Sequence, residues 1–154
     1  MNADKKILAK LQRFCVYRER SVQEVKEKLA LLNVPYAQYQ LYISLLEEQK
    51  FLNEQRFIKA FINDKFKINR WGKNKIKQAL ALHKISAHEA EEMFESCIDE
   101  QKYQKNLQHI ITRFKPKTKG LENYKAQQKI LAHCYAKGYE PEFTRKILEQ
   151  LKEE

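Results

Sequence analysis

The sequence predicts an all-α protein of three tandem three-helix repeats that form an elongated, curved array. The 154-residue chain has only three glycines and three prolines, too few for the turns of a β-sandwich, a β-barrel or a glycine-rich nucleotide-binding fold. Lys, Glu, Gln, Leu and Ala are abundant instead, and these residues favour helix. Apolar residues recur at helical spacing, and their pattern returns roughly every 50 residues.

Three helices are expected in the first repeat, residues 1–50. The first helix has apolar residues at spacings of three and four, namely Ile7, Leu8, Leu11, Phe14 and Cys15. Ser21 and Glu24 form the capping-box pattern that opens a second helix. That helix should end near Asn33, because Pro35 disfavours helical geometry in the residue before it. The apolar stripe of a third helix follows, with Tyr39, Tyr42, Ile43 and Leu46.

The pattern of the first repeat returns in residues 51–100 and again in residues 101–154. The middle helices show the recurrence through three apolar positions, which are Val25, Leu29 and Val34, then Ile76, Leu80 and Ile85, then Ile130, Cys134 and Tyr139. In a helical repeat array, each unit buries apolar surface partly against its neighbours. We therefore expect a long concave surface, which suits binding along a polymer or filament.

The net charge of +10 comes from two separate blocks of the chain. Residues 56–88 hold nine basic residues and one acidic residue, and residues 101–137 hold the same numbers. Between the two blocks, residues 89–100 hold six acidic residues and no basic one. This excess of positive charge indicates an anionic partner, either nucleic acid or an acidic protein surface. A solvated surface without a partner is the ordinary alternative.

Two short segments concentrate the positive charge where the first and second helices of a repeat meet. The candidate contact residues of the first segment are Lys65, Lys67, Arg70, Lys73, Lys75 and Lys77. Those of the second segment are Arg113, Lys115, Lys117 and Lys119. Such side chains can contact phosphates and give a salt-dependent affinity. Trp71 lies within the first segment, and we interpret it as a core residue rather than a platform for base stacking.

No catalytic, cofactor or metal site is predicted. His83 and His88 are five residues apart, which is the wrong spacing for two ligands on one helical face. The three cysteines, Cys15, Cys97 and Cys134, are odd in number and far apart, so they indicate neither a disulfide framework nor a zinc site. The chain shows no secretory signal and no membrane-spanning stretch. We therefore expect a cytoplasmic protein that is not an enzyme and has no membrane partner.

Three stretches of the chain match family motifs in order and spacing. They are YRERSVQEVKEKL from Tyr17, FLNEQRFIKAFINDK from Phe51 continued by WGKNKIKQAL, and ILAHCYAKGYEPEFTRKILEQL from Ile130. Together they resemble the RecX family of bacterial regulatory proteins. The family's fold is three tandem three-helix repeats, in agreement with the repeat found here. Where the family has a glycine near the end of each middle helix, this chain has Asn33 and Lys84 in the first two repeats.

The resemblance implies a monomeric regulator that binds the RecA–DNA filament, with accessory DNA binding. RecX proteins usually inhibit strand exchange, ATP hydrolysis and the SOS response, and so act in DNA repair and recombination without a cofactor. Arg18, Arg20 and Arg56 match motif positions and are further candidate contacts to RecA or DNA. Arg18 and Arg56 could equally tie helix ends to acidic residues of the adjoining repeat. The alternative function is a stand-alone basic nucleic-acid-binding protein without a recombinase partner.

Overall fold

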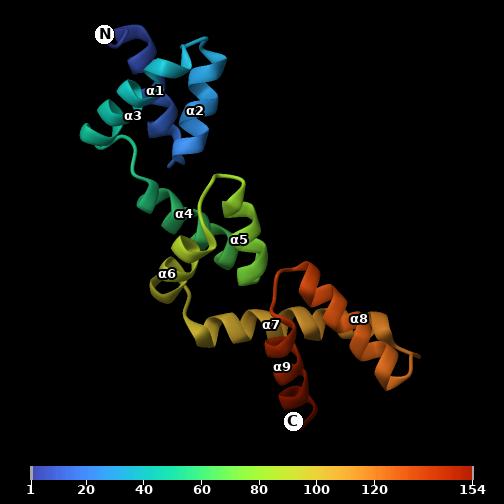
Figure 1. Ribbon diagram of the computed structural model, residues 1–154. Coiled ribbons are helices and arrows are strands. Elements are labelled where there is room, and N and C mark those ends of the chain that lie inside the picture. The colour runs from blue at the N-terminus through green and yellow to red at the C-terminus, as the bar shows by residue number, and fades with distance from the viewer. Residues whose placement is uncertain (1, 154) are drawn as a thin grey trace. The chain divides into compact units, whose positions relative to one another are not determined.

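The computed structural model describes residues 2–153, which form nine α-helices, two 3-10 helices and no strand (Figure 1). In chain order these are α1 (Lys5–Tyr17), α2 (Val22–Leu31), η1 (Tyr36–Gln38), α3 (Tyr39–Glu48), α4 (Glu54–Lys67), α5 (Lys73–Ala81), α6 (Ala87–Cys97), α7 (Glu100–Phe114), η2 (Lys115–Thr118), α8 (Asn123–Ala136) and α9 (Pro141–Glu153). The prediction of an all-α fold is confirmed.

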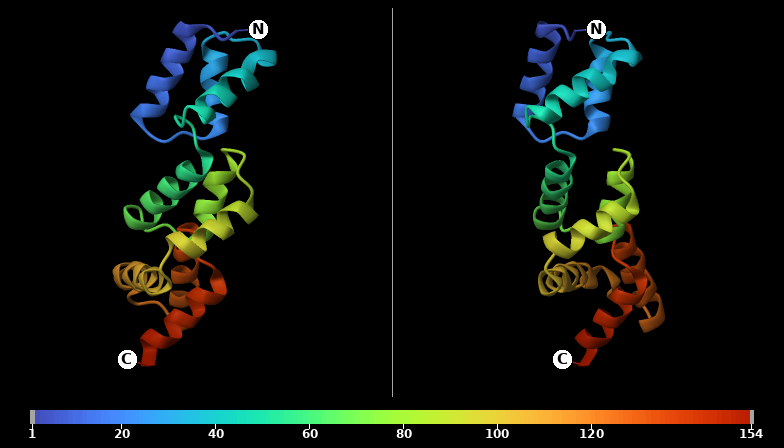
Figure 2. Two further views of the ribbon diagram at one scale, coloured as in Figure 1. Left: turned by 90° about the vertical axis from the view of Figure 1, so that its left-hand side faces the viewer. Right: turned by 60° about the vertical axis from the view of Figure 1, so that its left-hand side comes forward.

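The chain divides into two compact units, one ending at Phe61 and the other beginning at Ile62, so the division falls within α4. In the first unit, α1, α2 and α3 pack around one apolar core (Figure 2). The buried residues of this core are Leu11, Cys15, Val25, Leu29, Val34, Tyr42, Ile43, Leu46 and Leu52. The repeat boundaries expected after residues 50 and 100 stay predictions.

Local capping signals set the helix ends of the first unit. Asp4 caps α1, because its carboxylate accepts hydrogen bonds from the backbone N–H groups of Lys6 and Ile7. Ser21 and Glu24 form the predicted capping box at the start of α2. These side chains satisfy backbone donors that have no partner within the helix.

The same turn ends the middle helix at three places along the chain. Asn33, Lys84 and Gly138 have positive φ angles of 60°, 62° and 100°. After each, the next N–H donates to the carbonyl five residues earlier, pairing Val34 with Leu29, Ile85 with Leu80 and Tyr139 with Cys134 at 3.0, 3.2 and 3.0 Å. This hydrogen-bond pattern is that of the Schellman motif. All nine apolar positions that the repeat pattern aligns in the middle helices are buried.

In the second unit, the end of α8 packs against the connection between α4 and α5. The Gly72 N–H donates to the Lys137 carbonyl at 2.7 Å, and the Asn74 N–H donates to the Gly138 carbonyl at 2.9 Å. A Cβ on Gly138 would lie 2.4 Å from the Cβ of Lys75, so only glycine fits at this position. This backbone contact holds the residues before α5 against the end of α8.

A buried tyrosine joins three segments of the second unit. The Tyr103 hydroxyl accepts a hydrogen bond from the Lys73 N–H at 3.0 Å and donates one to the Glu140 carboxylate at 2.5 Å. Its ring centroid lies 5.0 Å from that of Tyr139 and 5.6 Å from that of Phe143. Burial, and then the hydrogen bond to Glu140, raises the pKa of the Tyr103 hydroxyl, so it remains a proton donor at neutral pH.

We predict that Gly138→Ala destabilises the protein by about 2–4 kcal/mol. An alanine is strained at the positive φ of this position, and its methyl group would overlap with Lys75. Denaturant unfolding measures this loss. Gly120→Ala is the matched control, since Gly120 has a φ of 87° but nothing within 4 Å of its Cβ position. The control should lose only about 1 kcal/mol. Equal losses for the two variants would contradict the steric argument.

We predict that Lys84→Gly stabilises the protein by about 0.5–1 kcal/mol, because a lysine at positive φ is strained and a glycine is not. Asn33→Gly should gain less, since asparagine tolerates this conformation. The midpoint of denaturant unfolding measures both changes. An unchanged or lower midpoint for Lys84→Gly would show that the lysine side chain stabilises the turn in another way.

Candidate nucleic-acid interface

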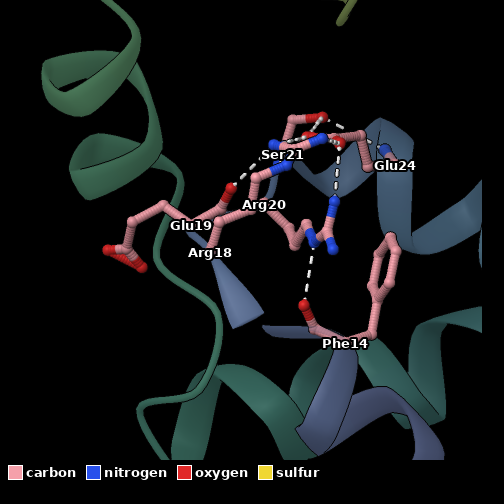
Figure 3. A network of polar contacts seen from close by, with 6 residues as sticks. All are labelled: Phe14, Arg18, Glu19, Arg20, Ser21 and Glu24. Atoms are coloured by element: carbon pink, nitrogen blue, oxygen red, sulfur yellow. Dashed lines mark hydrogen bonds and ion pairs between the residues drawn. The ribbon is translucent and has the colours of Figure 1, made fainter. Parts of the chain in front are cut away.

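The three arginines of the motif positions are engaged in contacts within the first unit. The Arg20 Nε donates to the Phe14 carbonyl at 2.8 Å, and its guanidinium lies 3.5 Å from the Glu24 carboxylate (Figure 3). The Arg20 side chain is only 10% exposed, and its guanidinium lies 3.7 Å from the centre of the Phe14 ring. Arg18 pairs with the same Glu24 carboxylate at 2.5 Å. Arg20 therefore ties the end of α1 to the start of α2.

Arg56 holds the start of α4 to the segment between α1 and α2. Its Nε lies 2.8 Å from the Glu19 carboxylate, and its Nη2 donates to the Lys50 carbonyl at 3.0 Å. The Arg56–Glu19 pair joins the expected second repeat to the first, as the alternative interpretation has it, whereas Arg18 pairs with Glu24 of its own repeat.

Two lysines of the first basic segment pair with the acidic stretch that follows it. Lys73 Nζ lies 2.6 Å from the Glu100 carboxylate, and Lys77 Nζ lies 2.6 Å from the Glu91 carboxylate. Both lysine side chains are largely covered, with exposed fractions of 18% and 26%. These pairs reduce the positive charge that the segment offers to a partner.

Trp71 is partly buried, so it belongs neither to the fully buried core nor to the exposed surface, and it lies between two lysines. The ammonium groups of Lys65 and Lys75 lie 4.8 and 4.4 Å from the centre of its ring. An indole face attracts cations at such distances. Trp71 therefore holds two of the candidate lysines in place at the surface.

The two basic segments meet in the second unit around a hollow of about 370 Å³, called here the second-unit hollow. Its polar and charged side chains include Arg70 from the first segment and Arg113 and Lys117 from the second, with Lys137, His109 and His133. None of the described residues that line it is acidic. The sequence predicted Arg70, Arg113 and Lys117 as contact residues, but it did not predict Lys137, His109 or His133.

One wall of the second-unit hollow is a stacked aromatic pair. The rings of Phe114 and His133 are nearly parallel, at 7°, with centroids 4.1 Å apart. Burial lowers the pKa of the His133 imidazole, and the nearby charges of Lys137 and Lys117 lower it further. The imidazole is therefore neutral at neutral pH.

A similar hollow of about 330 Å³ lies in the first unit and is called here the first-unit hollow. It is lined by Lys10, Arg13, Phe14, Tyr17, Arg20 and Lys28, again without a carboxylate among the described residues. Arg113 and Phe114 follow Arg13 and Phe14 by 100 residues, which is twice the repeat length of the first helices. Both hollows thus include an Arg-Phe pair from the C-terminal half of a helix, α1 in the first unit and α7 in the second.

The remaining candidate residues lie at the surface outside both hollows. Lys67, Lys115 and Lys119 are exposed, so they add to the positive charge of the second unit.

The part of the chain that the structure describes shows no cluster of three potential metal ligands and no helix long and apolar enough to cross a membrane. Cys15 and Cys134 are buried. Burial raises the pKa of the Cys134 thiol to about 11, so this thiol is protonated at neutral pH.

The sequence is similar to one family of proteins. The family model described as RecX, second three-helix domain, matches residues 53–93. Over 134 residues, the chain is 25% identical to the regulatory protein RecX of Bacillus pumilus (strain SAFR-032), covering 87% of this chain and 51% of that protein. The resemblance to the RecX family is confirmed. This chain spans about half the length of the RecX relative that it matches.

Two RecX crystal structures share the fold of this chain. RecX from Lactobacillus salivarius superposes with a TM-score of 0.86 at 17% identity, covering 96% of this chain and 95% of that one. A second crystal structure of the regulatory protein RecX gives a TM-score of 0.83 at 12% identity, covering 94% of this chain and 72% of that one. Of the cations around the second-unit hollow, only Arg70 falls within the matched RecX family model.

We predict that Arg20→Met destabilises this RecX-like chain by about 1–2 kcal/mol, because it leaves the Phe14 carbonyl without its charged donor and removes one of the two arginines that contact the Glu24 carboxylate. Arg18→Met is the matched control. Its side chain is 52% exposed, so we expect a loss below about 0.5 kcal/mol. Thermal and denaturant unfolding measure both variants. Equal stability of the two would show that Arg20 is available for binding rather than committed to the fold.

Proposed function

We propose that this chain is a RecX-type regulator that binds the RecA–DNA filament in the cytoplasm and inhibits RecA. The similarity to the regulatory protein RecX in sequence, together with the shared fold, supports this function. The filament consists of RecA protomers on a DNA strand, so a regulator that binds along it contacts RecA and can also contact the DNA. Inhibition requires no catalytic group, because occupying the filament is enough to slow strand exchange and ATP hydrolysis.

The observation that carries the accessory DNA binding is the pair of basic hollows. Each gathers several lysine and arginine side chains beside an aromatic ring, and the described residues that line each hollow include no carboxylate. Phosphate contacts from such side chains give salt-dependent affinity with little dependence on sequence. The same observation favours the second candidate function, a nucleic-acid-binding protein that acts without a recombinase.

The first test is the rate of ATP hydrolysis by the cognate RecA on single-stranded DNA. We expect the protein to slow hydrolysis at amounts equal to RecA or below. The double variant Arg113→Gln/Lys117→Gln should need about three- to tenfold more protein for half-inhibition, because two phosphate contacts are lost. Hydrolysis unaffected by the folded wild-type protein would refute RecA regulation.

The double variant Lys102→Gln/Lys105→Gln is the matched control, since it removes the same charge from exposed positions of α7 outside the hollow. It should inhibit almost as well as the wild type. Binding to DNA alone is measured in parallel by sedimentation across a salt series. Tight, salt-dependent DNA binding without any effect on RecA would establish the second candidate function instead.

A further inference from the structure

The second-unit hollow brings together four cations from segments far apart in the sequence. Arg70 precedes α5, Arg113 lies in the last turn of α7, Lys117 lies in η2 and Lys137 follows α8. No acidic side chain among the described lining residues offsets them. Cations that converge in this way repel one another. An anion bound between them relieves this repulsion and is attracted to all four cations.

The size and walls of the hollow suit a phosphate of a single nucleic-acid strand. A volume of about 370 Å³ is that of a small-molecule site and admits one nucleotide, not a duplex. Arginine presents planar donors that match two phosphate oxygens, and two arginines line the hollow. The aromatic wall of Phe114 and His133 is the kind of surface on which bases of single strands stack.

His133 is surrounded by positive charge from every element that lines the hollow. Lys137 lies on its own C-terminal side, Lys117 belongs to η2, and Arg113 belongs to α7, which also carries the His109 side chain. Arg70 completes the set from the connection after α4. A bound phosphate would offset part of the positive charge around the imidazole, which favours its protonated form.

The first-unit hollow has a lysine at the matching position. Lys28 Nζ lies 5.6 Å from the centre of the Phe14 ring, as His133 lies against Phe114. Lys28 and His133 each stand one residue before an aligned core position of their middle helix. The same place in the repeat therefore holds a lysine in one hollow and a titratable imidazole in the other.

We propose that the second-unit hollow binds a phosphodiester of single-stranded nucleic acid, and that the bound phosphate draws a proton onto His133. The proposal rests on the accessory DNA binding of the proposed function but not on RecA. A phosphodiester does not titrate near neutral pH, so the proton comes from solvent and stays on the imidazole while the strand is bound. Binding that takes up a proton becomes tighter as the pH falls.

The test is binding of an oligothymidine of about 15 nucleotides, without a terminal phosphate, between about pH 5.5 and 7.5 at constant salt. Thymine and the phosphodiester keep their charge over this range. We expect the affinity of the wild-type protein to rise about three- to tenfold toward the lower pH, since each unit of pKa shift on binding corresponds to a factor of about ten. Fluorescence anisotropy measures the affinity.

The variant His133→Lys introduces the residue that the first-unit hollow carries. It should bind the oligothymidine at least as tightly as the wild type at pH 7.5 and lose most of the pH dependence. His109→Gln should keep that dependence. A pH dependence of binding that survives in His133→Lys would overturn the assignment of the proton to His133.

Arg113→Gln tests the place of binding, with Lys125→Gln as its matched control. Both remove one positive charge from the second unit, but Lys125 is exposed and lies outside the hollow. We expect Arg113→Gln to lose at least about three times as much affinity as Lys125→Gln. Equal losses would overturn the hollow as the binding site.

Nuclear magnetic resonance of the wild-type protein provides a measurement that needs no variant. The His133 ring protons should shift toward the protonated position when oligothymidine is added at pH 7, and a ring that stays neutral would overturn the proposal. An acidic peptide of equal charge is the competing ligand. If the peptide shifts the ring and the oligothymidine does not, the hollow recognises an acidic protein and the nucleic-acid proposal is wrong.

Discussion

The backbone contact between Gly72 and the end of α8 is the constraint on which the second unit depends. Two hydrogen bonds join these segments, and the missing side chains at Gly72 and Gly138 let the backbones approach. The Tyr139 hydroxyl adds a third bond, to the Arg70 carbonyl at 2.8 Å. Together these bonds place Arg70 beside residues of α7 and α8. The hollow is thus a consequence of how two turns pack, and not of any one basic segment.

Helix ends and core positions could be predicted from the sequence because their causes are local. The capping box at Ser21 depends on a residue three positions away, and the middle-helix turns depend on spacing within one helix. The buried positions of the middle helices followed from the same periodicity. Sequence reasoning is strongest where a structural feature and its cause lie within one or two helical turns.

The candidate site was predicted only in part, because its residues meet through tertiary packing. Arg70, Arg113 and Lys117 lie in the two short segments that concentrate the charge, whereas His133 and Lys137 lie outside both segments. The return of the Arg-Phe pair after 100 residues was the signal that could have marked the hollow. Composition also could not show which lysines face carboxylates.

The close approach at Gly72 has a genetic consequence. A Cβ at this position would meet the backbone carbonyl of Gly138 and the backbone nitrogen of Tyr139, at 2.2–2.4 Å. Main-chain atoms are present in every amino acid, so no substitution of a neighbouring residue can remove them and make room for a Cβ at position 72. A screen for second-site suppressors of a Gly72 substitution should therefore recover true revertants to glycine, with few or no compensating changes elsewhere.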